Sequence, residues 1–246
     1  MSLPLASRIA LVTGASRGIG YAAALALARA GAHIVAVART VGGLEELDDA
    51  IKASGGTATL APLDLRDTAG IARLAVSLDE RYHKLDILIG NAGVSGPNSP
   101  LDHVQPADWD EVIAINITAN WHLVRQLHAL LLRSDAARVV FLTSGSASNA
   151  RAYRGPYSAS KAALETLART YANETATTNV RINVFSPGPT RTRMIASVMP
   201  GVDPMTLPTA EQVAEKIVPL CLPGFQESGK YYDFRAGKLL SFRPPA

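Results

Sequence analysis

The 246-residue sequence predicts an α/β fold, a single domain with one doubly wound parallel sheet of about seven strands and helices on both faces. Three observations carry this expectation. Short runs rich in Val and Ile alternate with longer runs rich in Ala and Leu. The short runs are almost continuously apolar, as expected of strands buried on both faces. No linker, repeat or change of composition divides residues 1–246.

The short β-branched runs are the expected strands, and each precedes a longer helical run. In chain order they are Arg8–Thr13, His33–Ala38, Thr57–Pro62, Asp86–Gly90, Arg138–Thr143, Val180–Phe185 and Gly229–Phe234. Parallel strands joined by right-handed helical crossovers form a Rossmann-type arrangement.

The longer runs are the expected helices because their apolar residues recur at helical spacing. In chain order they are Gly18–Ala30, Val41–Ser54, Thr68–Tyr82, Asp108–Leu132, Pro156–Thr175 and Ala210–Leu220. Gly31 and Gly55 follow the first two, where glycine commonly ends a helix. The proline-rich stretch Pro187–Pro208 is expected to be irregular, with a substrate loop at about residues 189–208.

Composition excludes several classes of function. The net charge is +3 and basic residues are interleaved with acidic ones, so we expect no nucleic-acid partner. The apolar runs are too short to cross a bilayer, and the N-terminus has no signal-peptide pattern. A single cysteine, Cys221, cannot form an intrachain disulfide. We therefore expect a cytoplasmic protein without a membrane partner.

A glycine-rich turn joins the first expected strand to the first helix, as Thr13-Gly14-Ala15-Ser16-Arg17-Gly18-Ile19-Gly20. Gly14 permits a tight turn, Gly18 lets the backbone approach a pyrophosphate, and Gly20 lets the helix pack closely on the sheet. The helix N-terminus offers free N–H groups and the positive end of its dipole to an anion. The strand–turn–helix context therefore predicts a dinucleotide site; the alternative is a turn without a ligand.

Two arginines favour NADP(H) as the cofactor. An acidic residue after the second strand typically binds the ribose of NAD, whereas an arginine accommodates the extra phosphate of NADP. Here that strand ends at Ala38-Arg39, without an acidic residue, and Arg17 lies in the glycine-rich turn. A guanidinium can pair with a phosphate through two hydrogen bonds. The alternative is that Arg39 is only a solvated charge.

Tyr157 and Lys161 suggest acid–base chemistry. They are four residues apart, hence on one face of an expected helix. A nearby ammonium favours the phenolate and lowers the pKa of tyrosine. Ser144 follows the preceding strand, at the edge where open α/β sheets bind ligands. A surface Tyr–Lys contact is the alternative for the pair, and Ser146 and Ser148 are alternatives to Ser144.

These motifs resemble those of the short-chain dehydrogenase/reductase (SDR) family in its compact single-domain form. Four agree in order and spacing: the T-G-x-x-x-G-x-G turn, Asn91-Ala92-Gly93 after the fourth strand, Ser144 thirteen residues before Tyr157, and the Y-x-x-x-K pair. The resemblance covers roughly Arg8 to Thr192. The C-terminal segment departs from it, because many members end in a segment with Asp-Gly-Gly, whereas this chain has Tyr231-Tyr232-Asp233-Phe234-Arg235-Ala236-Gly237.

The resemblance implies a role for each matched residue. Tyr157 would be the general acid/base, Lys161 would lower its pKa and bind the nicotinamide ribose, and Ser144 would hold the substrate carbonyl. Asn116 would hold a water in a proton relay to the lysine. No metal is implied. The implied cofactor contacts are Gly14, Ser16, Arg17, Gly18, Ile19, Gly20, Arg39, Asp64, Leu65, Asn91, Ala92, Gly93, Tyr157, Lys161, Pro187, Gly188 and Thr192.

The implied function is that of an NADP-dependent oxidoreductase, which moves a hydride between NADP(H) and a carbonyl or alcohol group of a small organic substrate. The alternatives are a nucleotide sensor on the same fold, and an epimerase or dehydratase acting on nucleotide-sugars. The resemblance also implies a homo-oligomer, a tetramer or dimer pairing Asp108–Leu132 with Pro156–Thr175. The sequence does not name the substrate; Arg151 and Arg154 could attract an acidic group or be solvated charges.

Overall fold

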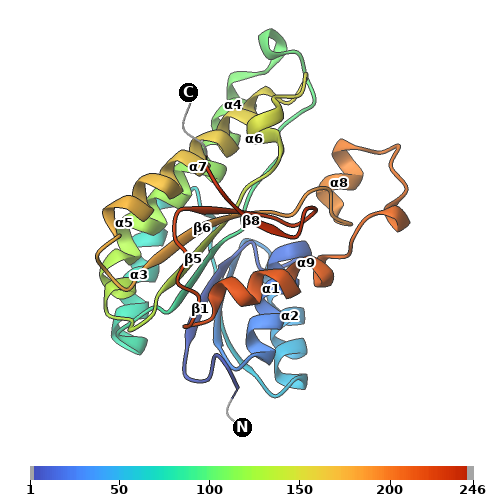
Figure 1. Cartoon of the computed structure of the whole chain (residues 1–246). Coiled ribbons are helices and arrows are strands. Elements are labelled where there is room, and N and C mark those ends of the chain that lie inside the picture. Colours follow the sequence, from blue (N-terminus) through green and yellow to red (C-terminus); the bar gives the residue numbers. More distant parts are fainter. Residues whose placement is uncertain (1–2, 243–246) are drawn as a thin grey trace.

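The computed structural model describes residues 3–242, which form one eight-stranded sheet between two layers of helices (Figure 1). The strand order is β3-β2-β1-β4-β5-β6-β7-β8, and every pairing from β3 to β7 is parallel. The parallel strands are β1 (Ile9–Thr13), β2 (His33–Ala38), β3 (Thr57–Pro62), β4 (Ile87–Gly90), β5 (Arg138–Leu142), β6 (Arg181–Ser186) and β7 (Lys230–Asp233). The doubly wound, Rossmann-type sheet expected from the sequence is confirmed.

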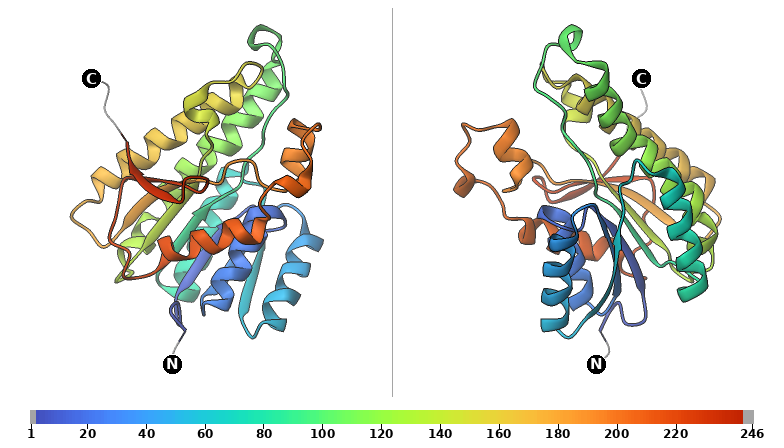
Figure 2. Two further views of the ribbon diagram at one scale, coloured as in Figure 1. Left: turned by 45° about the vertical axis from the view of Figure 1, so that its right-hand side comes forward. Right: turned by 180° about the vertical axis from the view of Figure 1, so that it is seen from behind.

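Helices cover both faces of the sheet, as the two views of Figure 2 show. On one face lie α1 (Gly18–Arg29), α2 (Val41–Ala53) and α9 (Ala210–Ile217). On the other lie α3 (Thr68–Tyr82), α5 (Ala119–Leu132) and α7 (Gly155–Glu174). The two apolar cores lie between these layers and the sheet, which is why the central strands are apolar on both faces.

The helix expected over Asp108–Leu132 begins earlier and contains a wider turn. It consists of α4 (Pro106–Ile113) and α5, joined by the π-helical turn η2 (Ala114–Thr118). Pro106 begins α4, because its fixed φ and missing N–H suit the first turn of a helix. The π turn contains Asn116, whose side chain bonds to the chain at Val94. Such turns re-aim a side chain within a helix.

Several short elements were not expected from the sequence. An eighth strand, β8 (Lys238–Ser241), pairs antiparallel with β7 across a turn at Gly237, where φ is +62°. The stretch Pro187–Pro208, expected to be irregular, contains helix α8 (Arg193–Val198) and the 3-10 turn η3 (Pro204–Thr206). Thr192 begins α8 by accepting a hydrogen bond from the N–H of Ile195 at 3.4 Å. The remaining short pieces are η1 (Leu101–His103), α6 (Ser146–Asn149) and η4 (Val218–Cys221).

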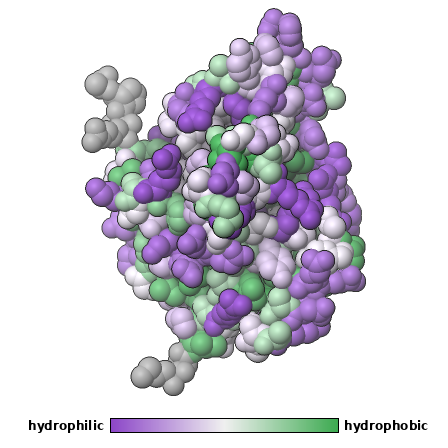
Figure 3. All heavy atoms as spheres, turned by 90° about the vertical axis from the view of Figure 1, so that its right-hand side faces the viewer, coloured by the Kyte–Doolittle hydropathy of each residue, from purple (hydrophilic) through white to green (hydrophobic). Residues whose placement is uncertain are grey.

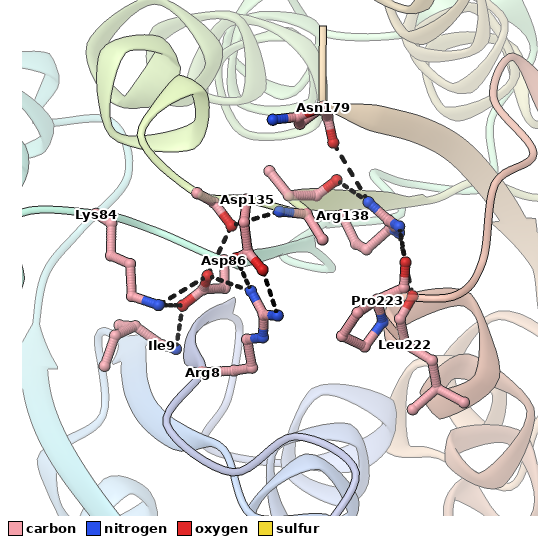
Figure 4. Close-up of polar contacts among 12 residues, drawn as sticks. Arg8, Ile9, Lys84, Asp86, Asp135, Arg138, Asn179, Leu222 and Pro223 are labelled. Carbon is pink, nitrogen blue, oxygen red and sulfur yellow. Dashed lines mark hydrogen bonds and ion pairs between the residues drawn. The ribbon is translucent and has the colours of Figure 1, made fainter.

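Polar contacts join the amino ends of the central strands (Figure 4). Asp86 accepts hydrogen bonds from Arg8 at 3.0 Å, from Ser134 at 2.6 Å and from the N–H of Ile9 at 2.9 Å. Arg138, at the start of β5, donates to the carbonyl oxygens of Leu222 and Pro223. These contacts hold the amino edge of the sheet together. Ligands of open α/β sheets bind at the opposite edge, where the strands end.

Hydrophilic and hydrophobic residues are interspersed on the face shown in Figure 3. Within residues 3–242, none of the helices combines the length and the hydropathy that crossing a bilayer requires.

Candidate active site

A cavity of about 1730 Å³ runs along the carboxyl edge of the sheet. The loops that follow the parallel strands line it, including Gly14 after β1, Arg39 after β2, Asn91 after β4 and Pro187 after β6. Helix α8 and the neighbouring chain cover part of it. One concave site therefore collects residues from most of the parallel strands, as expected at this edge of an open sheet.

The glycine-rich turn is shaped so that only glycine fits at its critical positions. Gly14 and Gly18 have φ values of +65° and +59°, a region that favours glycine. A Cβ on Gly14 would lie 2.8 Å from Nδ2 of Asn91, and a Cβ on Gly20 would lie 2.3 Å from the carbonyl oxygen of Gly14. The turn therefore keeps its backbone exposed to the cavity, while α1 packs directly against it.

Asn91 and Thr13 hold this turn against β4. Nδ2 of Asn91 donates to the carbonyl oxygens of Thr13 at 2.9 Å and of Gly14 at 3.3 Å. In return Oγ1 of Thr13 accepts from the N–H groups of Asn91 at 3.0 Å and of Ala92 at 3.1 Å. These bonds tie the loop after β1 to the loop after β4, and together the two loops form one floor of the cavity.

The charges around the turn suit a phosphorylated dinucleotide. Arg17 caps the N-terminus of α1, whose first turn has no acidic residue. Arg39 is exposed at the end of β2 and, among residues 3–242, neither arginine forms an ion pair. Asp64 forms an ion pair with Arg66, with Nη2 of the arginine 2.6 Å from Oδ2 of the aspartate. This hydrogen bond lowers the pKa of Asp64, and the charge of Arg39 lowers it less strongly. A positively charged corner therefore lies beside the turn.

Tyr157 and Ser144 both line the cavity, and their side chains lie close together. Tyr157 lies in the first turn of α7 and is 8% exposed, and Ser144 follows β5. Burial raises the pKa of Tyr157, while hydrogen bonding with Ser144 and the charge of Arg154 oppose that rise. The pKa of Tyr157 is therefore raised, not lowered by Lys161 as the resemblance implied, and its proton is available to a ligand in the cavity.

Lys161 lies one turn further along α7 and is 4% exposed. Its Nζ lies 5.7 Å from the centroid of the Tyr157 ring and donates a 2.7 Å hydrogen bond to the carbonyl oxygen of Leu142. Burial lowers the pKa of Lys161 to about 8, and the charge of Glu165 opposes the shift. The lysine is therefore a buried cation that titrates close to neutral pH.

Asn116 lies behind this pair without lining the cavity. It is fully buried, and its Oδ1 accepts from the N–H of Val94 at 2.9 Å, while Nδ2 donates to the carbonyl of Val94 at 2.9 Å and to Ser160 at 3.0 Å. A Cβ on Gly93 would lie 3.2 Å from Oδ1 of Asn116 and 3.5 Å from Nζ of Lys161. The two side chains thus flank the same glycine.

Most of the predicted site residues share the wall of this one cavity. Those that line it are Gly14, Ser16, Arg17, Gly18, Ile19, Arg39, Asp64, Leu65, Asn91, Ala92, Gly93, Ser144, Tyr157, Lys161, Pro187, Gly188 and Thr192. Asn116 and Gly20 stand behind the wall, the first joining a loop to α7 and the second packing α1 on the turn.

Residues of the C-terminal segment also line the cavity, and sequence reasoning did not assign them. They are Tyr231, Asp233 and Arg235, at the end of β7 and in the turn that follows. The side chain of Arg235 lies against Gly188, where an added Cβ would come within 3.0 Å of it. The sequence did contain a signal for these residues. Gly229–Phe234 was expected as a parallel strand, so its carboxyl end had to reach the same edge of the sheet as the cavity.

Comparison with known proteins identifies close relatives of this chain. The family model for short chain dehydrogenases matches residues 8–203. An oxidoreductase of Escherichia coli that is described as uncharacterized is 35% identical over 242 residues, covering 95% of this chain and 94% of that protein. A 3-oxoacyl-[acyl-carrier-protein] reductase of rhamnolipid biosynthesis in Pseudomonas aeruginosa is 39% identical over 197 residues, covering 77% of this chain and 75% of that protein.

A solved structure extends the likeness to three dimensions. A short chain dehydrogenase from Shigella flexneri, determined in complex with NADP, superimposes with a TM-score of 0.88. It is 34% identical, and the match covers 96% of this chain and all of that one. The structural match therefore covers a larger share of the chain than residues 8–203, which the family model matches.

Proposed function

The chain belongs to the short-chain dehydrogenase family, and we propose that within this family it is an NADP-dependent carbonyl reductase acting on a small organic substrate. The observation that carries the proposal is the juxtaposition of Tyr157, Ser144 and Lys161 in the cavity that also contains the glycine-rich turn. A nucleotide sensor would need the turn but no acid–base group. The named relatives support the reaction class without fixing the substrate.

The cradle fits a dinucleotide phosphate. Its turn exposes backbone N–H groups at the start of α1, and Gly14 and Gly20 leave no room for side chains. Arg17 and Arg39 supply two guanidinium groups and no carboxylate stands at the end of β2, which favours NADP over NAD. The Shigella flexneri relative was solved with NADP, in keeping with this preference.

The proposed mechanism assigns one task to each residue. When bound, reduced nicotinamide supplies the hydride that the carbonyl carbon accepts. Ser144 and Tyr157 orient the carbonyl oxygen through hydrogen bonds, and Tyr157 donates its phenolic proton to that oxygen. The product is an alcohol, and Tyr157 is left as a phenolate. The cation of Lys161 stabilises this negative charge until a proton from solvent restores the phenol. Asn116, whose side-chain donors are engaged by Val94 and Ser160, positions the loop beside Lys161.

The neutral form of Tyr157 suits the role of the acid in carbonyl reduction. An acid must carry its proton at working pH, and burial keeps the pKa of Tyr157 above its ordinary value. The reverse reaction would need the phenolate, which that burial disfavours. Ser144 and Arg154 limit the rise, so the tyrosine remains able to release its proton once a carbonyl oxygen develops negative charge.

A fluorescence titration followed by a substrate panel tests the proposal. The purified chain is titrated with NADPH and NADH while nicotinamide emission is recorded, and ketones, aldehydes and alcohols are then offered with the preferred cofactor. We expect tighter binding of NADPH and its oxidation by carbonyl compounds. Binding without turnover on the whole panel would favour the sensor, and absence of binding would refute the assignment of the glycine-rich turn.

We also propose a homotetramer in the cytoplasm. Trp121 on α5 is 42% exposed, with Arg125 stacked at 5.6 Å from its ring, so this helix presents a large aromatic surface for pairing. Cys221 is buried and burial raises its pKa to about 12, so the thiol is inert. The single cysteine of the chain is compatible with the reducing cytoplasm. Light scattering of the eluting protein tests the tetramer; a monomeric mass would refute it.

A further inference from the structure

Arg154 lies between the catalytic tyrosine and the α8 segment. Its guanidinium carbon is 4.9 Å from the centroid of the Tyr157 ring, and its Nη1 donates to Oδ1 of Asn98 at 3.0 Å. Asn98 in turn donates from Nδ2 to the carbonyl oxygen of Val198, at the end of α8, at 3.1 Å. Neutral and aromatic groups therefore fix the position of this guanidinium in the wall of the cavity.

The charge of Arg154 has no acidic partner. Within residues 3–242 no carboxylate forms an ion pair with it, and no protein group accepts a hydrogen bond from its Nε or Nη2. By contrast Arg8, Arg66 and Arg133 each pair with an aspartate. The side chain is half-buried, and burial lowers its pKa; Tyr157 opposes this shift and the nearby charge of Arg151 adds to it. A half-buried cation without a counter-ion favours an anionic ligand.

We propose that Arg154 binds the carboxylate of the substrate, so that the natural substrate is a short oxo acid. This assignment rests on the proposed carbonyl reduction and names its substrate class. The Nε–H and Nη2–H groups form the edge of a guanidinium that matches the two oxygens of a carboxylate. Because the guanidinium lies over the ring of Tyr157, which protonates the carbonyl, the carboxylate and carbonyl lie only a few bonds apart.

A carboxylate fits this site better than a phosphate ester. Nη1 is already engaged by Asn98, so Arg154 retains one two-donor edge and one positive charge. These match a carboxylate, which has two oxygens and one negative charge. A phosphate carries nearly two charges, and the additional cation nearby, Arg151, is exposed to solvent.

The experiment measures how the enzyme discriminates acids from their neutral analogues. The substrates are oxohexanoates with the oxo group at successive carbons, and the methyl ester of each. NADPH oxidation gives kcat/KM for the wild type, Arg154→Gln and Arg151→Gln. We expect the wild type to prefer an acid, and Arg154→Gln to lose about 10- to 100-fold in kcat/KM on that acid, mainly through KM. The ester should lose far less, and Arg151→Gln should lose less than about threefold on either.

The acid-to-ester ratio separates binding from acid–base effects. Arg154 lies over Tyr157, so any effect of its removal on proton donation is shared by acid and ester and cancels in the ratio. Equal losses on acid and ester, or a wild type that prefers esters, would overturn the assignment. An NADPH titration of each variant shows that the fold and the cofactor site are intact.

A binding measurement distinguishes this proposal from the proposed function. Hexanoate and hexanamide are titrated into the protein–NADP complex by calorimetry, without any reaction. Tighter binding of hexanoate that disappears in Arg154→Gln would support the carboxylate site even if no carbonyl were turned over. Equal affinity for both compounds would refute the site, even if neutral ketones were reduced rapidly.

Discussion

Nζ of Lys161 donates a 2.7 Å hydrogen bond to the carbonyl oxygen of Leu142, where β5 reaches the cavity. The bond holds the lysine against the sheet, but it provides only a neutral acceptor for a buried charge. Glu165 lies one turn further along α7 and accepts from Oγ1 of Thr143 at 2.7 Å. The pKa of Lys161 is therefore set by burial, which lowers it to about 8, against the weaker effect of Glu165.

This pKa predicts that the rate of reduction falls above pH 8. Lys161 is a cation below its pKa and neutral above it, so its support for the Tyr157 phenolate is present at pH 7 and lost as pH rises through about 8. The measurement is kcat/KM for NADPH-dependent reduction between pH 6 and about 10. Activity that stays constant across this range would show that the charge of Lys161 is not required.

Glu165→Gln tests whether the charge at position 165 sets the midpoint of that pH profile. The amide can still accept from Thr143, but it removes the charge that raises the pKa of Lys161. We expect the fall in kcat/KM to move to lower pH while NADPH binding is kept. A midpoint that does not move would exclude Glu165 as an influence on the lysine.

Replacing Tyr157 by phenylalanine should separate binding from chemistry. The ring keeps its place beneath Arg154, but the proton donor is lost, so we expect turnover to fall by about 10²- to 10⁴-fold. NADPH affinity, measured by fluorescence, should change little. Ser144→Ala is the comparison, with a smaller loss because Ser144 orients the carbonyl and gives no proton. Turnover close to wild type in Tyr157→Phe would refute the mechanism.

Arg39→Asp should shift the cofactor preference from NADPH towards NADH. The exposed guanidinium at the end of β2 would be replaced by a carboxylate, which repels a phosphate and can accept from ribose hydroxyls. We expect the ratio of kcat/KM for NADPH over NADH to fall by about 10- to 100-fold. Arg73→Gln, on α3 and paired with Asp67, is the control and should leave the ratio unchanged. An unaltered ratio in Arg39→Asp would place the phosphate elsewhere.

Sequence reasoning succeeded where the signal is local. Apolar runs identified seven strands, and each expected end lies within one residue of the observed end. The glycine-rich turn was recognisable because its constraints lie within eight consecutive residues. It failed for β8 because the four residues Lys238–Ser241 are mostly exposed and carry no clear alternation. Their pairing depends on β7 already being in place.

Long-range contacts account for the other failures. The π turn at Asn116 is stabilised by bonds to Val94, and helical periodicity in the sequence does not reveal such a turn. The bond from Arg154 to Asn98 joins residues 56 positions apart. Whether Arg154 was solvated or buried could not be decided until both loops had been placed.

Asn116→Ala should destabilise the fold as well as lower activity. The substitution leaves the N–H and carbonyl of Val94 without their buried partner and removes a donor to Ser160. We expect the free energy of unfolding in urea to fall by about 2–4 kcal/mol. Asn173→Ala, at an exposed position on α7, is the control and should change it by less than about 0.5 kcal/mol. Equal effects of the two substitutions would show that the Val94 contacts contribute little.

Arg138→Met should weaken the fold without affecting the cofactor site. The fully buried guanidinium donates to Leu222 at 3.2 Å, to Asn179 at 3.3 Å and to Pro223, and so fastens the chain before β7 to β5 (Figure 4). Methionine fills the volume but leaves those carbonyls without hydrogen-bond donors. We expect this loss to exceed the free energy gained by no longer burying a charge. We expect the free energy of unfolding to fall by about 2–4 kcal/mol.

The position of Arg138 makes this prediction separable from the catalytic ones. It begins β5, at the amino edge of the sheet, whereas the cavity lies at the carboxyl edge. NADPH affinity should therefore stay within about twofold of wild type below the unfolding transition. Arg138→Lys should be intermediate, because one ammonium reaches fewer carbonyls than the planar guanidinium. If Arg138→Met is as stable as the wild type, desolvation of the charge cancels the carbonyl bonds, and packing alone holds the chain before β7.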